Sequence, residues 1–151
     1  MVIQRLQNLY LLVAALLVTV YAFMESVIIK VGASVYSIDC LKMSIAPEGL
    51  MSCRPVSMVL TILSVLLIVL SIAKFKDLKA QKGSVRICVL INMALVAYVY
   101  LNASVMAKEL GGELACSWVA VLPIAAIVLQ FMAFRAVKRD IKLLSDSDRI
   151  R

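Results

Sequence analysis

Four long runs of apolar residues, each free of Asp, Glu, Lys and Arg, divide the chain. They cover residues 6–24, 55–73, 87–107 and 114–134, so that each is about 20 residues long. At about 1.5 Å of rise per residue, a helix of this length reaches roughly 30 Å, the thickness of the hydrocarbon layer of a bilayer. The pattern therefore predicts four membrane-spanning helices in an antiparallel bundle, and an all-α integral membrane protein.

The composition supports this interpretation. The chain has 151 residues, of which 64% are hydrophobic, whereas soluble domains contain roughly 45–50% apolar residues. The core of a soluble protein of this size cannot bury so much apolar surface. We therefore expect a single membrane domain over residues 1–151.

The positive charges predict the orientation. Twelve of the sixteen Lys and Arg residues lie before the first run, between the second and third runs (74–86) or after the fourth (135–151). Positive charge favours the cytosolic side, so both termini are predicted to be cytosolic. Because the net charge of +7 gathers beside the helix ends, we expect anionic lipid headgroups, and no nucleic acid, as the partner.

Residues 25–54 form the one sizeable segment between runs, on the outer side. Strand-like alternation around residues 31–36 predicts a small extracytoplasmic cap between the first two helices, with a hairpin. Cys40 and Cys53 lie thirteen residues apart, and a disulfide between them would stabilise the fold by about 3 kcal/mol. Cys116 is a competing partner, and two unpaired thiols are a further alternative.

Small polar residues recur inside the runs. Those of the second run fall on one helical face, and two asparagines of the third run need hydrogen-bond partners in lipid. We expect this polar stripe to face the bundle interior and the hydroxyls to bond the asparagines; the alternative is a polar path through the bundle. The stripe comprises Ser57, Thr61, Ser64, Ser71, Asn92 and Asn102.

The third and fourth runs are separated only by residues 108–113, K-E-L-G-G-E. The two glycines predict a tight turn, because glycine tolerates positive φ. Pro123 lies ten residues into the fourth run and removes a backbone donor. We therefore expect a kink near the middle of the fourth helix.

No residue pattern indicates catalysis. The chain has no histidine, which is the commonest general base and metal ligand. It also lacks a C-x-x-C pair, a G-x-S-x-G motif, a P-loop and a dinucleotide-binding glycine motif. The sequence predicts a protein that is not an enzyme and that binds no cofactor or metal.

The two ends of the chain resemble a known family. I-Q-R-L-Q-N-L-Y-L-L at residues 3–12 and R-A-V-K-R-D-I-K-L-L-S-D-S-D-R-I-R at residues 135–151 resemble the four-span membrane proteins of Bacteroidota catalogued as domain of unknown function 4293. The resemblance implies a bacterial inner-membrane protein and supplies no activity. The matching residues are Gln4, Arg5, Gln7, Arg135, Lys138, Asp140, Ser145, Asp148, Arg149 and Arg151.

Both matching segments fall on the predicted cytosolic side. There Arg5 could pair with Asp140 or Asp148, and the basic residues 135–142 share one face of a helical extension. We expect the two ends to form one cytosolic docking platform that closes the bundle or binds a partner. It would comprise Gln4, Arg5, Gln7, Arg135, Lys138, Arg139, Lys142, Asp148 and Arg149.

These observations lead to three hypotheses of function. The first is a non-enzymatic subunit or scaffold of a membrane complex, bound to another membrane protein or to copies of itself. The second is a small oligomeric transporter or channel in which the polar stripe lines the path. The third is thiol redox chemistry at Cys40 and Cys53.

Overall fold

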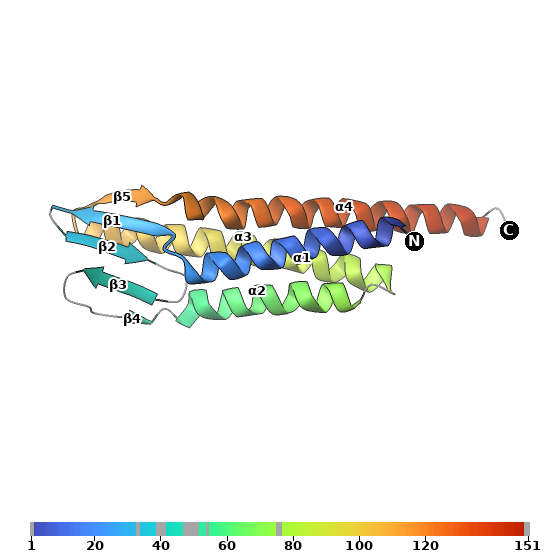
Figure 1. Cartoon of the computed structure of the whole chain (residues 1–151), viewed down its shortest axis with the longest axis horizontal. Coiled ribbons are helices and arrows are strands. Elements are labelled where there is room, and N and C mark those ends of the chain that lie inside the picture. Colours follow the sequence, from blue (N-terminus) through green and yellow to red (C-terminus); the bar gives the residue numbers. More distant parts are fainter. Residues whose placement is uncertain are drawn as a thin grey trace.

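The chain folds into a long bundle of four helices with a small sheet at one end (Figure 1). The computed structural model describes residues 2–32, 34–38, 42–46, 52–53, 55–74 and 77–149. The helices are α1 (Val2–Phe23), α2 (Pro55–Ala73), α3 (Leu78–Glu109) and α4 (Val121–Arg149). Because α1 begins and α4 ends away from the sheet (Figure 1), we call the two ends of the molecule the sheet end and the termini end.

Each apolar run predicted to be helical contributes a helix. All four helices are long and apolar enough to cross a membrane. Helix α2 has the predicted bounds, 55–73, and begins with Pro55, whose missing N–H leaves no bond unmade in a first turn. Helix α3 begins nine residues before the predicted residue 87, at Leu78. The Asp77 carboxylate caps it by accepting bonds from the backbone N–H groups of Lys79 and Ala80.

The fourth helix begins later than predicted. Residues 114–116, assigned to the fourth span, belong instead to strand β5 (Glu113–Cys116), and a short 3₁₀ helix, η1 (Trp118–Ala120), precedes α4. The prediction of a kink at Pro123 was also wrong, because it assumed that this proline lies near the middle of the fourth helix. Pro123 is the third residue of α4, where its missing N–H removes no bond within the helix.

The sheet corrects the all-α prediction. Within the described residues it has five antiparallel strands in the order β4-β3-β2-β1-β5. The expected hairpin is present as β1 and β2, which pair Ile29 with Tyr36. Strand β5 follows α3 in the sequence and pairs with the other edge of β1, where Leu114 lies opposite Ile29. The strands from residues 25–54 are β1 (Val27–Val31), β2 (Ser34–Ile38), β3 (Lys42–Ala46) and β4 (Ser52–Cys53).

Two clusters of buried residues hold the fold together. At the sheet end, Val27 and Ile29 of β1 pack with residues of α3 such as Val99. Along the bundle, all four helices contribute to a second cluster that includes Leu11, Ala14, Ile68, Val85 and Ala126. The outward faces are apolar as well, with exposed residues such as Leu16, Leu66, Leu90 and Val128. Helices that are apolar on all sides are suited to a membrane.

Candidate functional site: buried polar side chains and a basic groove

Polar side chains join α2 to α3 in the middle of the bundle. The hydroxyl of Ser64 donates a hydrogen bond of 3.0 Å to Oδ1 of Asn92, and both residues have no exposed surface. The Asn92 amide nitrogen has no partner among the described residues. One buried amide donor therefore remains unsatisfied at the centre of an apolar bundle.

The other stripe residues bond mainly within their own helices. Ser57, Thr61 and Ser71 are buried; Thr61 donates to the Ser57 carbonyl and Ser71 to the Leu67 carbonyl, each at 2.8 Å. Asn102 is half-buried and donates to the carbonyl of Tyr98 on its own helix. Among the described residues, Asn102 makes no hydrogen bond to a hydroxyl of α2, and its amide nitrogen donates to its own helix instead.

Three amide side chains connect α1 to α3 at the termini end. Gln7 donates through Nε2 to Oε1 of Gln81, and Gln81 donates through Nε2 to Oδ1 of Asn8, both at 3.1 Å. Gln7 and Gln81 are fully buried, and Oε1 of Gln7 has no partner among the described residues. We call Gln7, Asn8 and Gln81 the amide cluster. Gln7, which the platform prediction grouped with the basic tail, thus lies inside the bundle.

The sequence interpretation missed Gln81 because it lies within a basic segment. A signal was nevertheless present. The buried positions of α3 from Leu78 to Val99 recur at alternating spacings of three and four residues, which is the repeat of a helix face in a bundle. This repeat includes Leu78, Gln81, Val85, Cys88, Asn92, Leu95 and Val99. It extends from the apolar run back into the basic segment and places Gln81 on the inner face.

Helix α4 carries two further buried polar residues. Gln130 is fully buried, and neither its amide nitrogen nor its oxygen has a partner among the described residues. Asp140 is only 7% exposed, and both of its carboxylate oxygens are likewise without a partner there. Burying an unpaired carboxylate is costly. Helix α4 therefore carries two buried polar side chains whose hydrogen-bonding atoms have no described partner.

A basic groove runs along α4 at the termini end, and neither Gln130 nor Asp140 lines it. It has a volume of about 780 Å³, and the described residues that line it include five cations and no carboxylate. Phe131 and Phe134 line it as well, with ring centroids 6.4 Å apart. The full lining is Lys82 from α3 and Phe131, Phe134, Arg135, Lys138, Arg139, Ile141, Lys142 and Ser145 from α4. We call this set the basic groove.

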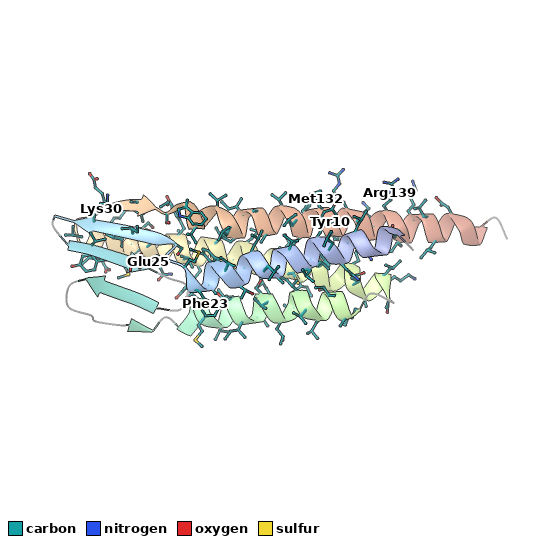
Figure 2. The ribbon with its side chains drawn as sticks, viewed as in Figure 1. Tyr10, Phe23, Glu25, Lys30, Met132 and Arg139 are labelled. Atoms are coloured by element: carbon teal, nitrogen blue, oxygen red, sulfur yellow. The ribbon has the colours of Figure 1, made fainter. Side chains whose placement is uncertain are left out.

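The structure thus brings together some of the predicted platform residues. Arg135, Lys138, Arg139 and Lys142 all line the basic groove. Figure 2 shows Arg139 on α4 near the termini end, far from Lys30 on β1. Gln4 and Arg5 belong to α1, and Asp148 and Arg149 to α4, but their side chains lie outside the described part of the chain. The expected pairing of Arg5 with Asp140 or Asp148 stays a prediction.

The cysteines give the predicted disulfide no support. Cys40 lies outside the described residues, and only the backbone of Cys53, in β4, is described. Cys116, the alternative partner, is a free and exposed cysteine, and Cys88 is free and buried. Within the described ranges, no three His, Cys, Asp or Glu residues come together in a way that could hold a metal ion.

Comparison with known proteins identifies the family. No curated protein matches the chain. A family model described as domain of unknown function (DUF4293) matches residues 3–150, nearly the whole chain. The resemblance noted at the two ends therefore extends through all four helices, and the chain belongs to the DUF4293 family.

Proposed function

We propose that this protein is a non-enzymatic subunit or scaffold of a membrane protein complex in a bacterial inner membrane, with both termini in the cytosol. The observation that supports this proposal is the free end of α4. Helix α4 continues beyond the points where α1 and α3 begin (Figure 1). There no described helix of this chain packs against its core-facing stripe.

The stripe can be followed along α4. Ala133 and Val137 are fully buried, and Leu144, two helical turns after Val137, lies on the same face but is 56% exposed. An isolated helix of a few turns is marginally stable in water. An apolar stripe that extends beyond the helix bundle is typical of a helix that binds a partner protein. The partner would bury residues of the stripe at the i, i+3, i+4 spacing of helix packing.

A matched pair of variants tests this proposal. Leu143 is exposed to a similar extent, 52%, but lies off the stripe. A tagged copy would be expressed at its native level, extracted in mild detergent and analysed by mass spectrometry for stoichiometric partners. We expect a partner with the unchanged protein and with Leu143→Gln, and its loss with Leu144→Gln. Recovery of the protein without a stoichiometric partner, or equal loss with both variants, would contradict the proposal.

The unsatisfied polar atoms favour a second candidate, a small oligomeric transporter. The amide nitrogen of Asn92 and both polar atoms of the Gln130 amide have no described partner inside an apolar bundle, and such groups need water or a passing solute. The test is labelling of Ser64→Cys by a membrane-impermeant thiol reagent, in a chain whose native cysteines are replaced. A matched control is Leu95→Cys, at an equally buried apolar position of α3. Labelling of the first site alone would favour transport.

A further inference from the structure

We infer that the basic groove binds an anionic phospholipid whose headgroup carries two phosphates. This inference rests on the proposed membrane placement, which puts the groove at the cytosolic interface. It concerns a different face of α4 from the stripe that ends at Leu144. The groove is lined by residues such as Arg135, Lys138 and Lys142, which follow one another at spacings of three and four residues.

The groove combines the two chemistries of a phospholipid. Phe131 and Phe134 belong to the apolar run and form its membrane-facing part, whereas Arg135 and the following cations form its aqueous part. From Phe131 to Lys142 the helix rises about 16 Å. This distance covers the upper acyl chains and the headgroup layer of one leaflet. A lipid standing beside α4 would therefore contact the rings with its chains and the cations with its headgroup.

The charge of the groove indicates how many phosphates it accommodates. Five cations line it, and none of its described lining residues is acidic. Two acids of α4 lie nearby: Asp140 is buried, Asp146 is exposed one turn after Lys142, and neither lines the groove. A headgroup with one phosphate would leave most of the cations facing one another without a counter-charge. Two phosphates neutralise more of them, and Arg135 and Arg139 can each bind a phosphate in the bidentate manner of guanidinium groups.

Lys82 indicates that the groove is a defined binding site between two helices and not only one charged face of α4. It reaches the groove from α3, whereas the other lining cations come from α4, so the headgroup would be held between two helices. Basic pockets between helices on the cytosolic side are typical sites for such headgroups. Lys79 lies one turn earlier on α3, is exposed, and does not line the groove. The two lysines therefore form a matched pair with the same charge on the same helix.

Native mass spectrometry of the full chain, released from nanodiscs, tests the inference. The nanodiscs would contain cardiolipin, phosphatidylglycerol or phosphatidylcholine as defined lipids, whose headgroups carry two negative charges, one negative charge and no net charge. We expect cardiolipin to be retained in preference to the other two. Lys82→Gln and Lys138→Gln should each weaken its retention about tenfold, and Lys79→Gln should change it less than twofold.

Several outcomes would overturn the inference. Equal retention of the three lipids would show that no headgroup site exists, and equal retention of cardiolipin and phosphatidylglycerol would refute the two-phosphate headgroup. Equal effects of Lys79→Gln and Lys82→Gln would reduce the binding to general attraction by surface charge. Loss of a protein partner with Lys82→Gln, with lipid retention unchanged, would assign the groove to that partner. Circular dichroism of each variant verifies that it is folded.

Failure of the membrane placement is detected separately. If an alkaline carbonate wash releases the native protein from its membrane, the proposed function fails whatever the lipid preference. If the protein stays in the membrane but shows no preference among the lipids, only the lipid site fails.

Discussion

The amide cluster provides the most direct test of what holds α1 to α3 at the termini end. Gln81 is fully buried, accepts a bond from Gln7 and donates one to Asn8. The substitution Gln81→Leu has a similar volume and removes both bonds. Since Oε1 of Gln7 already has no described partner, the whole buried amide of Gln7 would then be unsatisfied.

The expected loss of stability in Gln81→Leu follows from the unsatisfied amide of Gln7. A buried polar group left without its partner costs about 1–3 kcal/mol. Asn8 is half-buried, so water can replace its lost bond at little cost. We therefore expect Gln81→Leu to lower the free energy of unfolding by about 1–3 kcal/mol. The double variant Gln7→Leu/Gln81→Leu leaves no fully buried amide in the amide cluster and should lose less than the sum of the two single variants.

The measurement is reversible unfolding in mixed micelles with increasing sodium dodecyl sulfate, followed by circular dichroism. Gln130→Leu is the matched control, because it makes the same replacement at a fully buried glutamine whose amide has no described partner. It should raise the free energy of unfolding. The reasoning would be refuted if Gln81→Leu unfolded like the unchanged protein, or if Gln130→Leu lost as much stability as Gln81→Leu.

The same unfolding measurement checks two further predictions. Asp140→Asn should raise the free energy of unfolding at neutral pH, because it replaces a buried carboxylate whose oxygens have no described hydrogen-bond partner with a neutral amide that costs less to bury; a loss would show that attraction to cations such as Arg139 outweighs this cost. Ser64→Ala should lower it by about 1 kcal/mol, because the whole amide of Asn92 becomes unsatisfied, whereas Asn92→Leu removes that amide and should cost less. The reverse order would contradict the bond between them.

The helices could be predicted because their signal is local. An apolar run between charged residues determines a span, and α2 has the predicted bounds, 55–73. Strand β5 could not be predicted in this way. Residues 114–116 continue the apolar composition of the fourth run, and their assignment to a strand depends on pairing with β1, where Lys30 lies opposite Glu113. A contact between residues so far apart in sequence leaves no periodic signal in either segment.

The candidate sites also contain parts that could be predicted from a local sequence pattern and parts that depend on contacts between distant segments. The basic face of α4 could be read from the spacing of Arg135, Lys138 and Lys142. The contribution of Lys82 to the groove could not be predicted, because it depends on how α3 packs against α4. Gln81 was an intermediate case, since its position in the repeat of α3 indicated burial, but an amide within a basic segment is ordinarily exposed to water.

The approach of β5 to β1 can be tested at Gly112, which joins α3 to β5. A Cβ atom at this position would lie 2.6 Å from Cγ2 of Val31 and 2.7 Å from the carbonyl oxygen of Lys30. Because that oxygen belongs to the backbone of the sheet, Gly112→Ala must displace β5 from β1 and should cost about 1–3 kcal/mol. Gly83→Ala is the control: its Cβ meets nothing within 4 Å, and alanine in a helix should gain about 0.5–1 kcal/mol over glycine. Hydrogen exchange should quicken at Glu113–Cys116 in Gly112→Ala alone. Unchanged exchange there would show that β5 does not depend on this close approach.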